Sequence, residues 1–192
     1  MPKDYFTKKS EEEDTRARSY YKLQQIDKVS QMIRLGSYVL DLGSFPGGWM
    51  QYCLEKIGSK GFVFGVDVDE IEPFDEYKNY KFFYGDVFSE EAWKEIAEYQ
   101  FDVVFSDMAP KFSGIKDIDY LRTYELCKRA FYLAKKVLKP RGFFLCKMFR
   151  GEEFEKLKKE LEKSFIKVKM IKPDASKATS KEAYLLGIGF RG

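Results

Sequence analysis

Apolar residues occur along the chain in short continuous runs that alternate with longer amphipathic segments. The runs at 38–42, 61–66, 80–84, 101–105 and 143–149 predict buried strands, because they are short and bounded by glycine or charged residues. The segments between them have the apolar spacing of helices. Helices are therefore expected at residues 15–34, from the glycine-rich turn to about 57, at 89–98 with Ser89 as N-cap, at about 118–137 and at 152–163, and two further strands at 165–171 and 184–190.

Continuous apolar strands separated by helices are typical of a parallel sheet covered on both faces. The last two strands are joined only by a polar loop at 172–181, which is too short for a parallel crossover, so one of them should run antiparallel. The sequence thus predicts an α/β, Rossmann-like fold with a mostly parallel seven-stranded sheet, one antiparallel strand and helices on both faces. A chain of 192 residues suits a single domain, with a basic helical segment at 1–36 and a core at 37–192.

Composition removes several classes of chemistry. The chain has no histidine, which excludes the Ser-His-Asp triad and every zinc site that needs imidazole. Cys53, Cys127 and Cys146 are far apart, so we expect no metal site and no disulfide framework, but reduced, buried thiols in a cytoplasmic protein. No apolar run reaches 18 residues and the N-terminus lacks a signal-peptide core, so no membrane segment is expected.

Charge is distributed unevenly. Residues 1–36 carry 8 basic and 6 acidic side chains, residues 37–138 carry 12 and 18, and residues 139–192 carry 14 and 7, which gives +2, −6 and +7 and the net charge of +3. Basic ends that flank an acidic middle suggest that the two ends converge on a polyanion, while the middle holds another ligand. Lysine runs such as the one at 156–163 are also typical of a solvated helix face.

The turn at residues 43–48 connects the first strand to a helix and is rich in glycine, which lets a ligand approach the backbone and the helix N-terminus closely. Trp49 stands where a P-loop requires lysine, so this turn is not a nucleotide-triphosphate motif. Asp67 ends the second strand, where a carboxylate can accept hydrogen bonds from the ribose hydroxyls of an adenosine cofactor, and Asp86 at the end of the third strand can accept from adenine. These residues leave two cofactors open: a nicotinamide dinucleotide or S-adenosylmethionine.

Four charged residues suggest chemistry. Lys147 interrupts an otherwise apolar strand, where a lysine must be paired or reach solvent. Asp107 ends the neighbouring strand, Lys22 lies on the basic first helix, and Glu182 opens the last strand. A buried lysine beside a second ammonium loses basicity, whereas nearby carboxylates restore it, so the sequence alone does not fix the protonation state of Lys147.

Five segments in this order resemble the FtsJ-type (RrmJ-like) ribose 2′-O-methyltransferases, close to the enzymes of large-subunit ribosomal RNA. They are RARSYYKL at 16–23, DLGSFPGGW at 41–49, SDMAP at 106–110, FLCKMF at 144–149 and KPDASKATSKEAY at 172–184. Ser44-Phe45 departs from the small alanines common in the family, and the basic N-terminal extension is short. The resemblance covers nearly the whole chain, from Arg16 to Phe190.

The resemblance implies an S-adenosylmethionine-dependent fold and 2′-O-methylation of RNA, at a uridine of large-subunit ribosomal RNA or of the assembled subunit. Nothing in the sequence requires more than a monomer. The Lys-Asp-Lys-Glu tetrad of the family falls on Lys22, Asp107, Lys147 and Glu182, with Lys147 as proton acceptor. The family's cofactor contacts fall on Gly47, Trp49, Asp67, Asp86 and Asp107. The basic candidates for phosphate contacts are Arg16, Arg18, Lys172, Lys177 and Lys181, while Tyr20 and Tyr21 either stack on bases or pack inward.

Three alternatives compete with this interpretation. A transfer RNA methyltransferase of the same family shares the tetrad. A nicotinamide-dependent oxidoreductase shares the glycine turn and Asp67, but does not explain Lys147 beside Asp107. A non-catalytic RNA-binding protein shares the basic ends, but does not require all four tetrad positions.

Overall fold

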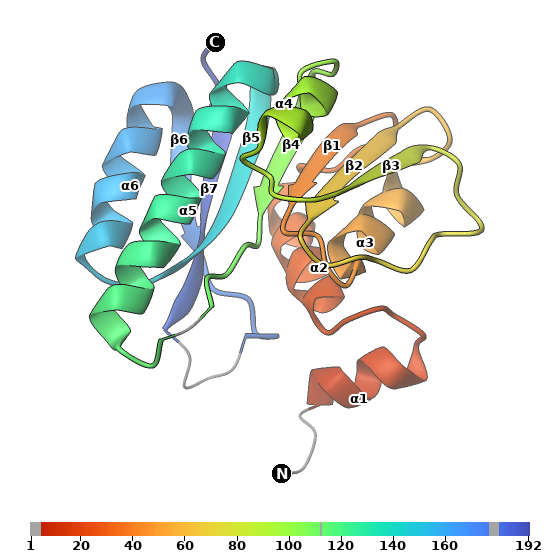
Figure 1. Cartoon of the computed structure of the whole chain (residues 1–192), viewed down its shortest axis with the longest axis horizontal. Helices are drawn as coiled ribbons and strands as arrows, with labels where there is room; N and C mark the ends of the chain where they lie inside the picture. The colour runs from red at the N-terminus through yellow and green to blue at the C-terminus, as the bar shows by residue number, and fades with distance from the viewer. Residues whose placement is uncertain (1–4, 112, 177–180) are drawn as a thin grey trace.

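A computed structural model describes residues 5–111, 113–176 and 181–192 of the chain. These residues form one seven-stranded sheet of order β3-β2-β1-β4-β5-β7-β6 (Figure 1). β7 is antiparallel to both of its neighbours and the other pairs are parallel, as the sequence predicted. The strands are Tyr38–Leu42 (β1), Phe62–Asp67 (β2), Tyr80–Tyr84 (β3), Phe101–Ser106 (β4), Leu138–Phe149 (β5), Phe165–Ile171 (β6) and Glu182–Phe190 (β7).

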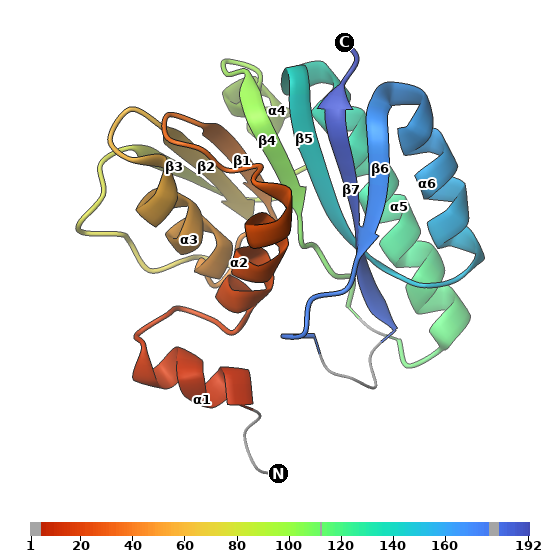
Figure 2. The ribbon, with the colours of Figure 1, turned by 180° about the vertical axis from the view of Figure 1, so that it is seen from behind.

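Helices cover both faces of the sheet. α4, α5 and α6 lie on the face seen in Figure 1, and α2 and α3 lie on the face seen in Figure 2. Within the described ranges, no helix combines the length and apolar character needed to cross a membrane. The helices are Tyr5–Glu12 (α1), Ser19–Ser30 (α2), Gly48–Ile57 (α3), Glu90–Ile96 (α4), Lys116–Val137 (α5) and Glu152–Ser164 (α6).

Two apolar clusters fill the space between these layers. One packs α4, α5 and α6 onto the sheet around Phe64, Phe144 and Phe165, and the other packs α2 and α3 around Val39 and Tyr184. The three cysteines are free and buried within these layers. Because strands β1 to β5 pair in parallel, their carboxyl ends lie at a common edge of the sheet, which carries Asp67 and Asp107.

The structure corrects three expected elements. The helix expected at 15–34 spans only Ser19–Ser30, because Gln31 adopts a left-handed conformation (φ 51°), although Ile33 beyond it is still buried. α1 precedes it as a separate helix, inside the segment 1–36 that was expected to be helical but outside the single helix expected at 15–34. β5 begins at Leu138 rather than at 143, and its register with β4 shifts at this point, so Pro140 is accommodated in an interrupted ladder.

Asp27 fixes the end of α2 against α3. Its carboxylate is fully buried and accepts hydrogen bonds from the Ile33 N–H at 3.0 Å and the Tyr52 hydroxyl at 3.0 Å, and it forms an ion pair with Lys56. A buried carboxylate with three partners is costly to remove, because each partner is left without an acceptor. The position of α2, which carries Lys22, depends on this contact.

Replacing Asp27 by alanine is expected to lower the free energy of unfolding by roughly 3 kcal/mol, since it leaves two buried donors and one half-exposed ammonium unpaired. Denaturant unfolding measures the change. Asp27→Asn keeps an acceptor for the Ile33 N–H and should lose less. A loss below about 0.5 kcal/mol for the alanine variant, the range of ordinary surface substitutions, would contradict this role of Asp27.

Candidate active site

The glycine turn brings backbone close to backbone at the end of β1. Gly43 has φ +83°, and a Cβ added there would lie 2.9 Å from the backbone N and Cα of Met108. Only glycine fits this conformation and this contact. The Asp67 carboxylate accepts a hydrogen bond from the Phe45 N–H at 2.8 Å, so the end of β2 holds the turn in place.

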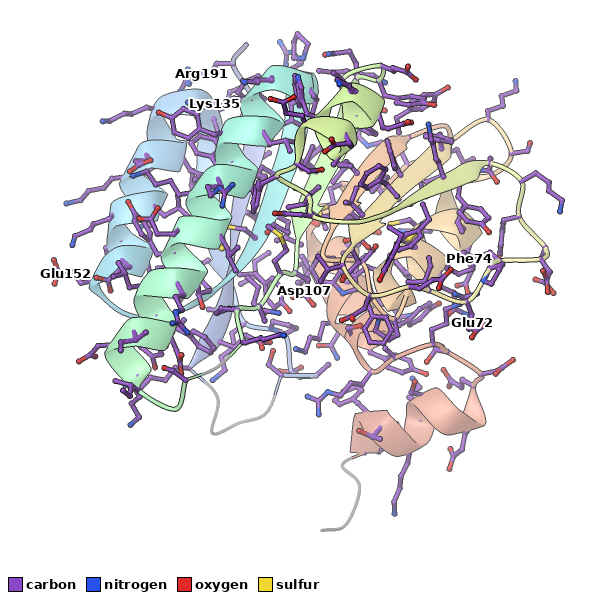
Figure 3. All side chains as sticks on the ribbon, viewed as in Figure 1. Glu72, Phe74, Asp107, Lys135, Glu152 and Arg191 are labelled. Carbon is purple, nitrogen blue, oxygen red and sulfur yellow. The ribbon has the colours of Figure 1, made fainter. Side chains whose placement is uncertain are left out.

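A cavity of about 490 Å³ opens beside this turn at the carboxyl ends of the parallel strands. Three predicted site residues, Asp67, Asp86 and Asp107, line it together with Gly43 and Met108. In Figure 3, Asp107 lies where β4 ends, near the middle of the molecule. The size suits a nucleoside-sized ligand, and the position is where ligands bind in open α/β sheets.

The hydrogen-bond acceptors of the cavity fit an adenosine cofactor, whose hydroxyl and amino groups are donors. Asp67 already accepts the N–H groups of Phe45 and Asp69, and Asp86 accepts that of Phe88 at 2.9 Å. A carboxylate has about four acceptor positions, so each of these two retains capacity for hydroxyl or amino donors of a ligand. Within the part of the chain that the structure describes, neither carboxylate forms an ion pair with a lysine or arginine.

Unsatisfied polar groups lie behind the glycine turn. The Asp41 carboxyl and the hydroxyls of Ser44 and Ser106 are buried and have no hydrogen-bond partner among the residues that the structure describes. Burial raises the pKa of Asp41 well above its ordinary value, and the charges of Asp107 and Asp67 raise it further. Buried polar groups left without partners are rare in folded proteins and often mark a ligand or water site.

Gly47 and Trp49, the other two predicted cofactor contacts, do not line this cavity. Gly47 (φ 104°) precedes α3, and a Cβ there would lie 3.0 Å from the Arg16 side chain. Trp49 is buried and donates its indole N–H to the Ser19 carbonyl at 2.8 Å, and its ring packs against Phe105. The structure thus gives the Trp49 side chain a packing role beneath the site, and its contact with the cofactor stays a prediction.

Gly43→Ala is expected to weaken cofactor binding at least tenfold, because its Cβ forces Met108 away from the turn and strains the backbone. Isothermal titration with S-adenosylmethionine measures this. Gly36→Ala is the matched control: Gly36 also has a positive φ (+80°), but no atom lies within 4 Å of its added Cβ. Equal losses in cofactor affinity for the two variants would show that only backbone strain matters.

The four residues of the predicted tetrad form two ion pairs, and one of the four, Asp107, also lines the cavity. Lys147 Nζ donates to the Asp107 carbonyl at 2.6 Å and lies 3.0 Å from Asp107 Oδ1. Lys22 Nζ lies 2.6 Å from Glu182 Oε1. All four side chains are 12–17% exposed, so they are shielded from bulk water but accessible to a substrate.

Tyr184 connects the two pairs. Its hydroxyl lies 3.3 Å from Asp107 Oδ1 and 3.5 Å from Glu182 Oε1, and it can donate to either carboxylate. Ser176 also donates to Glu182 at 3.1 Å. The sequence analysis missed Tyr184, although its position two residues after Glu182 on a strand places both side chains on the same face.

The carboxylates control the charge of Lys147. Burial on its own lowers the pKa of Lys147, but the charge and hydrogen bond of Asp107 and the charge of Glu182 together raise it above its ordinary value of 10.5. Burial likewise raises the pKa of Glu182, but Lys22 and Lys147 more than compensate, and the net shift is downward. Lys147 is therefore an ammonium in the free protein at neutral pH, which resolves the balance that the sequence left open.

Arg16 is engaged with the protein itself. Its guanidinium stacks on the Phe74 ring, 3.5 Å from the ring centre, and donates to the carbonyls of Glu72 and Pro73. Glu72 and Phe74 are labelled at the right of Figure 3. Desolvation lowers the pKa of Arg16. Its main role in this structure is to hold the loop between β2 and β3, and its contact with phosphate stays a prediction.

The other basic candidates lie around the tetrad. Arg18 donates to the Ala175 carbonyl at 2.9 Å and so joins the start of α2 to the loop before β7. Lys172 and Lys181 are exposed at the two ends of that loop, while Lys177 lies outside the described residues. Tyr20 and Tyr21 pack inward, with hydroxyls bonded to Glu55 and Glu13.

Comparison with known proteins identifies the family of this chain. The sequence profile described as FtsJ-like methyltransferase matches residues 15–190. The chain belongs to the FtsJ-like methyltransferase family. It is 41% identical over 191 residues to the ribosomal RNA large subunit methyltransferase E of Bdellovibrio bacteriovorus, covering 97% of this chain and 96% of that protein. It is 38% identical to the protein of the same name from Methanobrevibacter smithii, covering 98% and 90% of the two chains.

Solved structures show the same fold. A putative ribosomal RNA methyltransferase from Plasmodium falciparum aligns with a TM-score of 0.79 at 27% identity, over 92% of this chain and 99% of that one. Fibrillarin from Aeropyrum pernix, solved with natively bound S-adenosyl-L-methionine, aligns with a TM-score of 0.58 at 17% identity, over 81% and 68%. The second likeness concerns the fold alone. This FtsJ-like protein is a methyltransferase with the Rossmann-like fold that the sequence predicted.

Proposed function

We propose that this FtsJ-like methyltransferase transfers the methyl group of S-adenosylmethionine to the ribose 2′-oxygen of a uridine in large-subunit ribosomal RNA. One observation carries the proposal: Asp107 lines the cofactor cavity and is also the ion-pair partner of Lys147. The proposed base, Lys147, therefore lies next to a residue of the cofactor cavity, where the ribose hydroxyl of the RNA would have to bind. The names of the relatives from Bdellovibrio bacteriovorus and Methanobrevibacter smithii support the choice of substrate.

The carboxylates of Asp67 and Asp86 would hold the adenosine part of the cofactor, and Gly43 lets the backbone approach it. S-adenosylmethionine, when bound, supplies the electrophilic methyl group. Lys147 accepts the proton of the ribose hydroxyl as the oxygen–methyl bond forms and the sulfur–methyl bond breaks. This requires the neutral amine, so the ammonium of the free protein must first lose a proton to water.

The other residues position the reacting groups. Asp107 fixes Lys147 through two oxygens, and Glu182 holds Lys22 at the opposite side of Tyr184. Holding the hydroxyl and the methyl group in line contributes most of the rate, and base catalysis adds roughly 10²–10⁴-fold. RNA would approach along Arg18, Lys172 and Lys181, so binding should weaken steeply with salt.

Methyl transfer from labelled S-adenosylmethionine tests the proposal. Undermethylated large subunits, naked large-subunit RNA and bulk transfer RNA are offered in parallel, with a Lys147→Ala variant as the background control. We expect label in ribosomal RNA only, mapped to a ribose 2′-oxygen. Label in transfer RNA would overturn the substrate, and label on a base would overturn the chemistry. We further propose a cytoplasmic monomer, which light scattering of the purified protein checks for the oligomeric state.

A further inference from the structure

A groove of about 430 Å³ lies between α4 and the C-terminal half of α5, on the face seen in Figure 1. Its lining includes the aromatic side chains of Phe88 and Trp93 and three cations, Lys128, Arg129 and Lys136. Phe88 and Arg129 also line the cofactor cavity, so the two depressions are adjacent. No part of the tetrad lines this groove.

The cations of the groove face aromatic rings instead of carboxylates. Arg129 lies 3.9 Å from the centre of the Phe88 ring, and Lys136 lies 5.0 Å from that of Trp93. Lys128 lies 5.5 Å from the ring of Tyr124. Within the described ranges, none of these three cations forms an ion pair. Glu125 is the one acidic residue of the lining and pairs with none of the three cations among the described residues, so the groove keeps an excess of positive charge.

The neighbouring helix α6 shows what a solvated lysine face looks like in this protein. There Lys156 pairs with Glu152, and Lys158 lies within 4.0 Å of Glu155 and Glu162. By contrast, the lining of the groove holds three cations, Lys128, Arg129 and Lys136, against the single carboxylate of Glu125. The helix macrodipole favours cations in the last turn of α5, which accounts for Lys136 but not for Lys128 and Arg129, two turns earlier.

We propose that this groove, lined by Phe88, Trp93, Lys128, Arg129, Tyr132 and Lys136, is a second RNA-contact surface. It would hold a segment of the substrate other than the one that carries the reacting nucleotide. The inference rests on the proposed function, which supplies the polyanion. Lysine and arginine contact phosphates, and the ring of Tyr132, 56% exposed, provides a face on which a base can stack.

The groove and the tetrad lie at different places on the protein, so two segments of the RNA would be needed to contact both. The tetrad lies where the parallel strands end, near Asp107, whereas the groove follows α5 towards its C-terminus, where Lys135 is labelled in Figure 3. Lys147 is not among the residues that line the groove, so the groove would hold a different nucleotide from the one that reacts. A folded RNA with two backbone segments can contact both sites, and its affinity would then exceed that of a short strand bound at the tetrad alone.

Footprinting of the unmodified protein provides the first test. Surface lysines are acylated in the presence and absence of naked large-subunit RNA, and the modified positions are measured by mass spectrometry. We expect RNA to protect Lys128 and Lys136 at least threefold and to leave Lys156 and Lys158 on α6 unprotected. Equal reactivity of Lys128 and Lys136 with and without RNA would overturn the proposal.

A pair of double variants provides the second test. K128A/K136A should weaken binding of large-subunit RNA about ten- to one-hundredfold and reduce the slope of log affinity against log salt by about 2, since two phosphate contacts are lost. K156A/K158A removes the same charge from α6 and should leave both values unchanged. Cofactor affinity and melting temperature should match the unmodified protein in both variants, because these side chains line neither the cavity nor the core.

The outcomes separate this inference from the proposed function. If the unmodified protein methylates ribosomal RNA but K128A/K136A binds it with the same affinity as K156A/K158A, the groove is not an RNA-contact surface and the proposed function is unaffected. If K128A/K136A loses affinity while methyl transfer maps to transfer RNA, the groove stands as an RNA site and the substrate changes. If the unmodified protein binds no RNA at all, both are overturned.

Discussion

Lys147→Ala is expected to reduce single-turnover methyl transfer at least a hundredfold while leaving the affinity for S-adenosylmethionine within about threefold. The magnitude follows from the loss of a positioned base, which contributes roughly 10²–10⁴-fold. Cofactor affinity should survive because Lys147 is not among the residues that line the cavity. Rapid-quench measurement with saturating enzyme gives the rate of the chemical step, and calorimetry gives the cofactor affinity.

Two further substitutions distinguish a base from a charged positioning residue. Lys147→Arg keeps a cation beside Asp107 but cannot lose its proton in the accessible pH range, so it should be as slow as the alanine variant. Lys147→Met removes the charge with little change in volume, and it shows whether an unpaired Asp107 alone disturbs the cofactor site. An arginine variant that retains more than a tenth of the rate would reject Lys147 as the proton acceptor.

The sequence predicted the sheet because its strands are continuous apolar runs with clear limits. β1, β3 and β6 have the expected bounds, and the short loop before β7 correctly required an antiparallel strand. Helix ends were harder to predict. The end of α2 depends on Asp27, whose partners Tyr52 and Lys56 lie on α3, and such tertiary contacts leave no local pattern.

Only part of the site could be predicted, because several of its contacts also depend on distant segments of the chain. The carboxylates of Asp67, Asp86 and Asp107 follow strands, and their common edge could be inferred from the parallel order. The roles of Arg16 and Trp49 could not be inferred, because each is determined by packing against a distant segment, the Phe74 loop and the ring of Phe105. The protonation of Lys147 required the distances to Asp107 and Glu182, since burial and attraction act in opposite directions on its pKa.

The rate of methyl transfer should rise about tenfold per pH unit from pH 7 to pH 9. The pKa of Lys147 lies above 10.5 in the free protein, so the neutral amine is a minor form throughout this range, and its fraction increases tenfold with each unit. The expected direction is therefore higher activity at higher pH, with no plateau before pH 9. Single-turnover kcat/KM for RNA reports this free-enzyme ionisation, provided that product release does not limit the rate.

Asp107→Asn tests whether the carboxylate of Asp107 determines this pH dependence. Without the carboxylate, the attraction that raises the pKa of Lys147 is lost, while burial still lowers it, so the pKa must fall. The residual activity of Asp107→Asn should then level off at lower pH than that of the unmodified protein, even though its maximum is reduced because Asp107 also lines the cofactor cavity. In the Lys147→Arg variant, the rate of methyl transfer should not rise with pH through ionisation of residue 147. Any rise that remains in this variant reports ionisation of the ribose hydroxyl. A flat profile of the unmodified protein between pH 7 and 9 would mean that Lys147 is already neutral when RNA reacts, or that it does not take the proton.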